Sequence, residues 1–559
     1  MLLYDAGDEI GRASKVFLMM ALIQQLIDRV ETQQDTPAIQ IFREGKWKWY
    51  SWGELLQQVQ AFAWVLKNLG ITRGNRVGIL AESGLEWIVA DLACHYVKAV
   101  SVPLSTQISQ RQLESQMDHS GLCLLLVDDV NRVTGVKFGT GVSVMNLGDS
   151  RATDEESIQR SLDWVGCWPD LKRHAGVMEG PLPMETCDPT RISTIMYTSG
   201  TTDSPKGVML TEGNLMFNSQ QAFACYGFDS TAHQYSFLPF FHAFARTCDL
   251  YVWLCGGHRL SLASARKNTI QDLAHVCPTH INGVPHYFHR LRQAALECDH
   301  EVRVWGDLLE QVNCGGAALS DDLYMFYETA GITMLEGYGL TETSPVASLN
   351  TQGAQRMGSV GKALAETELR IDVSGEIQIR GPHVMAGYYR DSQQTQAAYD
   401  DGWLKTGDLG YLDDEGFLFV TGRETEMIVT SRGQNVWPGT IEMELAKHAA
   451  IGQAVVFGDG SDDLVALICP DWDHVVAVLD LSGSPKQWVG SPQVENWFLE
   501  IVQQQLSALA RHEQIAKVAL IESPLTAEND MLTPKGTLRR CQIAMVFEDV
   551  LKRLYSGSP

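Results

Sequence analysis

The stretch Tyr197-Thr-Ser-Gly-Thr-Thr-Asp-Ser-Pro-Lys-Gly-Val-Met-Leu-Thr211 is the most informative part of this sequence. The apolar, β-branched run Ile192–Met196 just before it predicts a buried strand. Its hydroxyls, glycine and single lysine together offer backbone N–H groups, polar side chains and a cation to a phosphate. It is not a Walker loop, because Pro205 replaces the second glycine and Lys206 is followed by Gly207. The alternative is a polar turn between two strands.

Composition sets the broad class. With 559 residues, 45% of them hydrophobic and 20% charged, the chain is predicted to be a soluble globular protein of two or more domains. The formal net charge of −25 argues against nucleic-acid partners and against docking on an anionic membrane. The twelve cysteines include no Cys-x-x-Cys pair, which favours reduced thiols over disulfides or zinc and predicts a cytoplasmic location.

The N-terminal part of the chain alternates helix and strand patterns. Val16–Ile27 is too short to span a bilayer and is predicted to be a first core helix, with a membrane-surface helix as the alternative. Ser51 and Glu54 have capping-box spacing, and the helix that they open is expected to end at Gly70. The alternation predicts a parallel α/β sheet from the helices Leu55–Leu69 and Leu85–Val97 and the strands Val77–Ala81, Ala99–Leu104 and Leu122–Val127. Residues 131–188 show no assignable pattern.

Three later segments carry candidate chemistry. Ser236-Phe-Leu-Pro-Phe-Phe-His242 places a histidine among aromatic residues; alone, it would be an ordinary partly buried histidine. Val312-Asn-Cys-Gly-Gly-Ala-Ala-Leu319 is a strand that runs into a Gly-Gly turn, where small residues allow close approach to the backbone. Glu336-Gly-Tyr-Gly-Leu-Thr-Glu-Thr-Ser-Pro345 nearly imitates a dinucleotide fingerprint, but position 342 is glutamate instead of glycine.

Together these segments resemble the adenylate-forming enzymes, which comprise acyl-CoA synthetases, luciferases and adenylation domains. The first stretch matches their phosphate loop, Thr-Ser-Gly-(Ser/Thr)-Thr-Gly-x-Pro-Lys-Gly. Leu-Pro-x-x-His242 followed by Ala-Phe-x-Arg246 looks most like the long-chain fatty acyl-CoA synthetases. The resemblance implies an α/β fold: a large multi-layer N-terminal domain, residues 1–422, and a smaller mobile α+β C-terminal domain, residues 423–559.

The resemblance also implies roles for individual residues. Tyr338 would stack on adenine, Thr341 would contact the α-phosphate, Glu342 would hold Mg²⁺, and His242 would lie near the acyl group. The remaining ATP or AMP contacts would come from Thr198, Ser199, Gly200, Thr201, Thr202, Lys206, Gly315, Gly316, Ala317, Gly337, Gly339, Asp408 and Arg423. Coenzyme A would enter near Gly433 and Pro438.

Three positions depart from the family pattern. Asp203 stands where glycine is usual, and Thr425 takes the hinge position that usually holds Lys or Asp. Thr537 occupies the place of the C-terminal catalytic lysine, and the nearest lysine, Lys535, lies two residues earlier. Residues two apart in an extended segment point to the same side, so Lys535 is predicted to replace the missing lysine. The alternative is a solvated loop lysine and a slow or inactive enzyme.

The implied reaction joins a carboxylic acid to a thiol at the expense of ATP. We expect a medium- to long-chain fatty acid as the small-molecule substrate, ATP and Mg²⁺ in the first step, and coenzyme A as the acceptor. One alternative is transfer of the acyl group to a carrier-protein thiol. The other is a nucleotide-binding relative that is impaired in adenylation. No nucleic-acid partner is expected, and membrane contact is expected to be peripheral at most.

Overall fold

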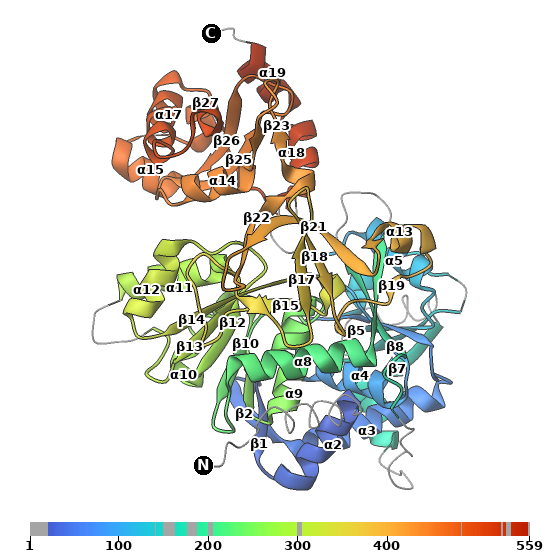
Figure 1. The fold of residues 1–559 in the computed structure, drawn as a ribbon. Coiled ribbons are helices and arrows are strands. Elements are labelled where there is room, and N and C mark those ends of the chain that lie inside the picture. The colour runs from blue at the N-terminus through green and yellow to red at the C-terminus, as the bar shows by residue number, and fades with distance from the viewer. Residues whose placement is uncertain are drawn as a thin grey trace, which may run out of the picture. The chain divides into compact units, whose positions relative to one another are not determined.

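The fold is taken from a computed structural model, which describes residues 21–139, 141–148, 163–175, 187–198, 205–298, 304–481, 483–526, 529–532 and 538–556. The chain divides into two compact units (Figure 1). The large unit comprises Met1–Arg370, Gln378–Thr406 and Leu412–Phe419. The small unit comprises Ile371–Ile377, Gly407–Tyr411 and Val420–Pro559. A large α/β N-terminal part and a smaller C-terminal part are thus confirmed.

The first sheet of the large unit has eight strands in the order β19-β9-β8-β4-β3-β5-β6-β7. Its central pairs are parallel, whereas β9 runs antiparallel to both β8 and β19. The strands are β3 (Arg76–Leu80), β4 (Val100–Pro103), β5 (Leu124–Val127), β6 (Ser143–Asn146), β7 (Asp163–Cys167), β8 (Ile192–Thr198), β9 (Lys206–Thr211) and β19 (Gly387–Tyr388).

The second sheet has nine strands in the order β16-β15-β14-β13-β12-β10-β11-β1-β2. It is parallel from β1 to β14, so the carboxyl ends of those strands share one edge. The strands are β1 (Pro37–Arg43), β2 (Lys46–Ser51), β10 (His233–Ser236), β11 (Arg259–Leu262), β12 (His280–Gly283), β13 (Gln311–Cys314), β14 (Thr333–Gly339), β15 (Val346–Leu349) and β16 (Lys362–Ala363).

Local sequence signals explain several of these elements. Ser51 and Glu54 form the predicted capping box of α3 (Trp52–Asn68), and Gly70 follows with φ +78°. The predicted helix at residues 85–97 is confirmed as α4 (Leu85–Tyr96), as are the strands β3, β4, β5 and β8. The described part of the predicted first helix is displaced, because α2 spans Leu22–Gln33 and runs beyond Ile27. The unassigned stretch 131–188 contributes β6, β7 and α7 (Trp168–Ala175).

The main core of the large unit joins its two sheets. One cluster of buried side chains takes members from β1 and β11 as well as from β3 and β8. The helices α3, α4, α8 (Glu212–Tyr226) and α9 (Val252–Gly256) contribute to it, and Trp52 stacks on Trp253 with ring centroids 4.6 Å apart. A π-helix, η2 (Ala245–Tyr251), precedes α9 and is buried throughout. This type of helix is rare and is found frequently at functional sites.

The small unit is built on a three-stranded sheet covered on both faces. Its strands are β25 (Ile451–Phe457), β26 (Leu464–Pro470) and β27 (Ile515–Leu520), with β26 in the centre. Every residue of β26 is buried: Leu464, Ala466 and Ile468 join one core, whereas Val465, Leu467 and Cys469 join another. The first core is closed by α14 (Pro438–Ala446), α15 (Trp472–Leu479) and α17 (Pro492–Gln505), the second by α18 (Arg540–Val546) and α19 (Glu548–Ser556).

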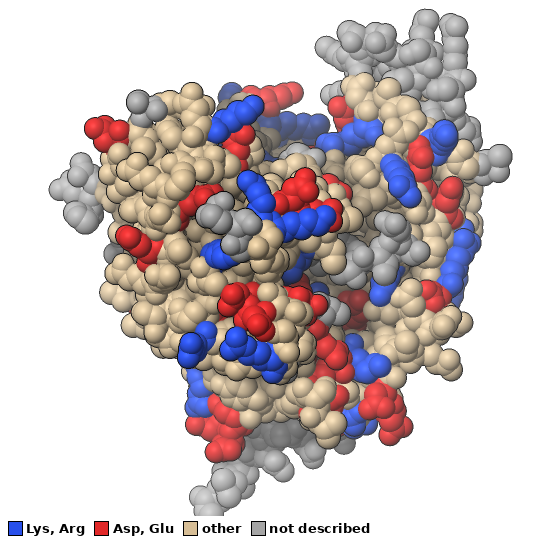
Figure 2. All heavy atoms as spheres, turned by 90° about the horizontal axis from the view of Figure 1, so that it is seen from above, with Lys and Arg blue, Asp and Glu red and all other residues tan. Residues whose placement is uncertain are grey.

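A further sheet of five strands contributes residues to both units. Its strands are β17 (Glu368–Ile371), β18 (Glu376–Arg380), β21 (Trp403–Leu412) and β20 (Tyr399–Asp400), with β22 (Leu418–Arg423) beside β21. Among the described helices, none is long and apolar enough to cross a membrane. The face drawn in Figure 2 carries cationic and anionic side chains interspersed, so the negative net charge is not gathered into one acidic field there.

Candidate active site

The two ends of the phosphate-loop stretch lie opposite each other. Thr198 ends β8, Lys206 begins β9, and the two are paired across the antiparallel strands. Close packing demands the glycine that follows Lys206, because a Cβ on Gly207 would lie 2.8 Å from the Ile195 side chain. The loop tip, with Ser199, Gly200, Thr201, Thr202 and Asp203, lies outside the described residues.

The Gly-Gly turn lies directly after β13, at the edge of the second sheet where parallel strands end. A Cβ on Gly315 would lie 3.4 Å from the Gly337 carbonyl oxygen and 3.6 Å from the ring of Phe244. Gly316 has φ +83°, and a Cβ there would lie 3.7 Å from Val284. The turn predicted to meet adenine therefore lies beside both predicted acyl-site segments. Ala317, the third predicted residue of this turn, is exposed.

The Gly-Tyr-Gly-Leu-Thr-Glu string closes β14 and opens a short 3₁₀ turn, η4 (Thr341–Thr343). No residue with a side chain fits in place of Gly339, because a Cβ there would lie 1.7 Å from the carbonyl oxygen of Pro345. Tyr338 is half-buried and Thr341 is buried. Glu342 is half-buried, and its Oε1 accepts a hydrogen bond of 3.0 Å from the hydroxyl of Tyr388. Tyr388 was not among the residues predicted from sequence.

A buried carboxylate stands at the head of the same string. Glu336 is buried on β14, and its Oε1 accepts the Leu319 backbone N–H at 3.3 Å. Burial raises the pKa of Glu336 to about 8, and the Leu319 N–H opposes that rise. Burial therefore favours the protonated form of this carboxyl group, which contacts the backbone at Leu319.

The acyl-site histidine lies on a turn that leads into the π-helix. The backbone N–H of His242 donates to Pro239, and that of Arg246 donates to the carbonyl of His242. The turn is anchored from the first sheet, because Ser83 Oγ, in the loop after β3, accepts the N–H of Phe240 at 2.9 Å. His242 is half-buried, and its ring lies 4.1 Å, centroid to centroid, from that of Phe241.

Arg246, on the π-helix, is the centre of one buried network. Its guanidinium pairs with Asp91 of α4 and donates to Thr194 Oγ1 of β8 at 2.7 Å and to Ser101 of β4. Burial alone would raise the pKa of Asp91, but Arg246, His95 and the Tyr251 hydroxyl together outweigh it, so the pKa lies below its ordinary value. Tyr251 also donates to Asp91, at 2.7 Å. The network thus fixes the π-helix against the strand that leads into the phosphate loop.

Asp249, one turn further along the π-helix, is the centre of a second buried network. It accepts hydrogen bonds from Gln234 at 2.8 Å, Asn282 at 2.6 Å and Ser236 at 2.6 Å. Burial raises the pKa of Asp249 to about 7, although these three neutral donors oppose the rise. Asn282 in turn accepts from Asn313 at 2.7 Å. The network therefore connects β10, β12 and β13, the three strands that lead to the histidine, to Val284 and to the Gly-Gly turn.

The remaining predicted contacts belong to the small unit. Asp408 is buried on β21 and forms an ion pair with Arg423, Nε to Oδ1 at 2.8 Å. Gly433 has φ +73° in the turn between β23 (Ile428–Val429) and β24 (Asn435–Val436), and Pro438 is the first residue of α14. The two predicted ribose contacts are thus adjacent to each other within this unit. Lys535 and Thr537 lie outside the described residues.

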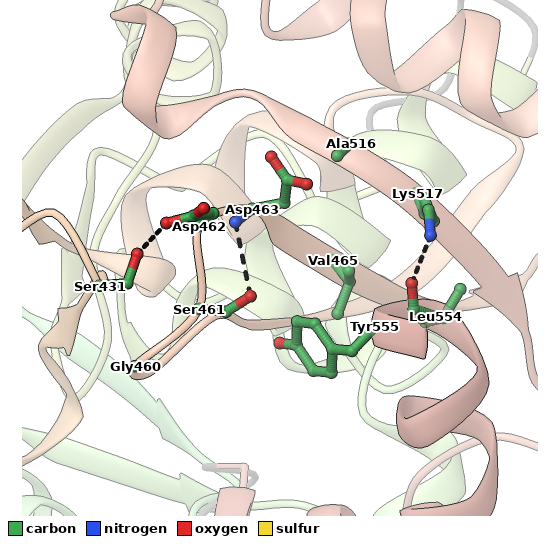
Figure 3. A pocket seen from close by; sticks show the side chains of 10 residues that line it. All are labelled: Ser431, Gly460, Ser461, Asp462, Asp463, Val465, Ala516, Lys517, Leu554 and Tyr555. Atoms are coloured by element: carbon green, nitrogen blue, oxygen red, sulfur yellow. Dashed lines mark hydrogen bonds between the residues drawn. The ribbon is translucent and has the colours of Figure 1, made fainter. Parts of the chain in front are cut away.

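A cavity of about 430 Å³ opens in the small unit next to the turn that holds Gly433 (Figure 3). Lys517 Nζ donates to the carbonyl of Leu554 at 2.6 Å, and Ser431 donates to Asp462. Both contacts hold polar groups of the wall in place. The cavity is lined by Ser431, Gly460, Ser461, Asp462, Asp463, Val465, Ala516, Lys517, Leu554 and Tyr555.

The site chemistry fits a magnesium-bound nucleotide. No cluster of three or more His, Cys, Asp or Glu side chains that could hold a metal occurs among the described residues. Mg²⁺ bound with a nucleotide is commonly held by one or two carboxylates together with substrate phosphates. Glu342 supplies such a carboxylate, Lys206 a cation, and the close approach of Gly315 to Gly337 a slot without side chains.

The family assignment comes from comparison with known proteins. Residues 26–389 match the family described as AMP-binding enzyme, and residues 425–559 match the AMP-binding enzyme C-terminal domain. A long-chain-fatty-acid–CoA ligase of Mycobacterium bovis is 30% identical over 94% of this chain and 96% of its own length. A 2-succinylbenzoate–CoA ligase of Bacillus cereus is 30% identical over 80% of this chain and 87% of its own.

Solved structures agree on the fold. The O-succinylbenzoate coenzyme A synthetase of Bacillus subtilis, in complex with ATP and a magnesium ion, superposes with a TM-score of 0.72 at 23% identity, covering 93% of this chain and 98% of its own. ATP-bound MatB of Rhodopseudomonas palustris gives 0.77 at 23% identity, covering 95% of this chain and 100% of its own. The chain belongs to the AMP-binding enzyme family and is an adenylate-forming CoA ligase.

Proposed function

We propose that this enzyme activates a medium- to long-chain fatty acid as acyl-AMP and transfers the acyl group to coenzyme A. The observation that carries the proposal is the convergence of Phe244 and Val284 on the turn at Gly315 and Gly316. Apolar side chains there lie next to the candidate adenine site, where an acyl carboxylate must reach the α-phosphate. The long-chain-fatty-acid–CoA ligase relative, matched over nearly its whole length, supports the same substrate class.

In the first half-reaction a carboxylate oxygen of the fatty acid attacks the α-phosphorus of ATP, and pyrophosphate leaves. We assign Tyr338 to stacking on adenine, Thr341 to the α-phosphate, and Lys206 with the loop around Thr198 to the outer phosphates. Mg²⁺ held by Glu342 would neutralise phosphate charge as pyrophosphate departs. The protein's own part is mainly positioning and fixed electrostatic stabilisation.

In the second half-reaction the thiol sulfur of coenzyme A attacks the acyl carbon, and AMP leaves with the bonding electron pair. We assign the ribose to Asp408 and Arg423, which already form an ion pair, and the entry of the thiol to the region of Gly433 and Pro438. We place the domain boundary between residues 422 and 423. The small domain that follows it would be rearranged between the two half-reactions.

The test is AMP formation from a panel of carboxylic acids, with and without coenzyme A, followed by product mass. Fatty acids of medium to long chain are expected to give acyl-CoA, and Glu342→Gln should lower adenylation by about 10²-fold or more as charge stabilisation is lost. Selective turnover of an aromatic acid would instead point to the substrate class of the 2-succinylbenzoate–CoA ligase relative. Normal pyrophosphate release by the variant at saturating Mg²⁺ would refute the role of Glu342.

We further propose that Lys535 replaces the lysine missing at Thr537. Lys535→Ala should lose adenylation yet still convert supplied acyl-AMP to thioester, because the lysine acts only in the first step. Thr537→Lys is the matched variant. If it alone adenylates, the natural chain is an impaired member of the family, and if Lys535→Ala adenylates as well as the wild type, Lys535 has no such role.

A further inference from the structure

A two-residue strand fastens Tyr388 to the candidate phosphate site. In β19, Tyr388 pairs with Val208 and Gly387 with Met209, so the strand lies antiparallel to β9. The backbone N–H of Tyr389 donates to Gly207 at 2.7 Å, which brings this pairing to within one residue of Lys206. Some 180 residues of chain separate the two strands, and both belong to the large unit.

The same segment is also fastened to the turn that carries Glu342. The N–H of Met385 donates to the backbone carbonyl of Glu342 at 2.8 Å, and Ser344 Oγ donates to the carbonyl of His383 at 2.8 Å. Asn214, in the first turn of α8, donates to the carbonyls of Pro382 and Val384. The backbone on either side of Tyr388 is therefore held at both ends, by β9 and by η4.

The Tyr388 side chain contacts both charged groups of the site. Its hydroxyl donates to Glu342 Oε1 at 3.0 Å, and Lys206 Nζ lies 5.7 Å from the centre of its ring, within cation–π range. The side chain is half-buried and packs against the main core of the large unit. A phenol is well suited to this double contact, because one rigid ring presents a face to a cation and a hydroxyl to an anion.

Lys206 and Glu342 carry opposite charges, and both must face the triphosphate in the proposed function. Each could instead pair with the other. A lysine and a glutamate at contact distance attract by about 1–4 kcal/mol in a partly solvated site, and such a pair would have to separate before ATP and metal could bind. In the part of the chain that the structure describes, Lys206 and Glu342 form no ion pair with each other. Each is instead in contact with Tyr388.

We propose that Tyr388 is a positioning residue that holds Glu342 and Lys206 apart and oriented for metal-bound ATP. This inference rests on the function proposed above. The hydroxyl engages one carboxylate oxygen, Oε1, which would leave the other available to the metal. Hydrogen bonds to ligating carboxylates are a general feature of metal sites, and their loss typically lowers metal affinity or activity about 10- to 100-fold.

The test separates the hydroxyl from the ring. Tyr388→Phe keeps the ring and removes only the hydroxyl, whereas Tyr388→Leu removes both. Tyr389→Phe is the matched control, because Tyr389 is the next residue of the same segment and its ring faces His119 instead of the charged pair. Binding of ATP is titrated calorimetrically for each variant, once with excess Mg²⁺ and once with EDTA, and Mg²⁺ dependence of pyrophosphate release is measured alongside.

Tyr388→Phe should bind ATP about 10-fold more weakly than the wild type in the presence of Mg²⁺ and equally well in EDTA. Tyr389→Phe should match the wild type in both titrations. Tyr388→Leu should also weaken binding in EDTA, because Lys206 is then able to pair with Glu342. Scanning calorimetry of the unliganded variants identifies any that are misfolded.

Two results would overturn the inference. If Tyr388→Phe binds ATP normally with Mg²⁺, the hydroxyl does not orient the carboxylate. If it weakens binding equally with Mg²⁺ and with EDTA, it acts on the nucleotide and not through Glu342. Failure of the wild type itself to bind ATP with Mg²⁺ would refute the proposed function as well, so the two failures are distinguishable.

Discussion

Asp91, a partner of the π-helix, and Asp249, a residue of it, are both fully buried carboxylates, yet their pKa values move in opposite directions. Asp91 faces the guanidinium of Arg246, and its pKa lies below the ordinary value of 3.8. Asp249 faces two amides and a hydroxyl, and its pKa rises to about 7. Burial disfavours the charge in both places, and it is outweighed only at Asp91, where the charge of a guanidinium acts together with hydrogen bonds. The guanidinium beside Asp91 is the main difference between the surroundings of the two carboxyl groups.

The pH dependence of stability follows from these directions. Asp91, with a depressed pKa, stabilises the fold above its unfolded pKa near 3.8, and that contribution is lost as pH falls through the folded value. Asp249 behaves oppositely. Between its unfolded pKa and about 7 the folded state keeps a proton that the unfolded state has released, so stability falls as pH rises across that window.

The largest expected effect comes from removing the cation. Arg246→Met leaves Asp91 buried without its charge partner, and we expect a loss of about 3–5 kcal/mol in the free energy of unfolding. The thermal midpoint of the large unit should fall accordingly in scanning calorimetry at pH 7. The double variant Asp91→Leu/Arg246→Met should regain much of the loss, because no unpaired charge remains. Equal destabilisation of the single and double variants would show that packing, and not charge, dominates here.

An intermediate effect is expected when the carboxylate of Asp249, which accepts these hydrogen bonds, is removed. Asp249→Leu removes the acceptor of Ser236, at a cost of about 1–3 kcal/mol for an unsatisfied buried group, whereas Gln234 and Asn282 still donate to the carbonyl of Cys248. Thermal unfolding should show a smaller loss than for Arg246→Met. A loss as large as that of Arg246→Met would mean that the two networks are energetically alike.

At acidic pH the smallest effect, and the most diagnostic, is that of Asp249→Asn. Asparagine keeps the shape and resembles the protonated acid, since it accepts from Gln234 and Asn282 through its oxygen and donates to Ser236. The variant should match the wild type below the unfolded pKa of 3.8 and become relatively more stable as pH rises to about 7, because the unfolded wild type alone gains by ionising across that range. The thermal midpoints of both proteins are compared across that range. A difference independent of pH would show that folding does not raise the pKa of Asp249.

The sequence predicts those parts of the molecule whose causes are local. The capping box at Ser51, the strand before Thr198 and the Gly-Gly turn after β13 each follow from residues within a few positions of one another. The π-helix does not, because Arg246 and Asp249 interrupt an otherwise apolar run and their partners lie on α4 and β12. Tyr388 was missed for the same reason: a two-residue strand has no periodicity, and its pairing with β9 is settled by tertiary contacts.

The site prediction divides along the same line. The resemblance named Glu342 and Lys206 because their motifs are continuous in sequence, and it named Asp408 and Arg423, which the structure pairs within the small unit. It could not name the buried acids beneath the site. Glu336 and Asp249 are distinguished only by burial and by hydrogen-bond partners that, in the described part of the chain, carry no positive charge, and burial is a property of the folded chain.

Gly339 and Gly361 flank the strand β15 from either side. A Cβ at either position would fall within 2 Å of backbone atoms, of Pro345 for Gly339 and of Leu349 for Gly361. Backbone atoms cannot move aside as the end of a side chain can. No other amino acid is therefore expected to be tolerated at either position. In a saturation-mutagenesis library selected for function, both codons should retain only their synonymous changes. At these two positions, evolution is therefore expected to accept changes in the codon but not in the amino acid.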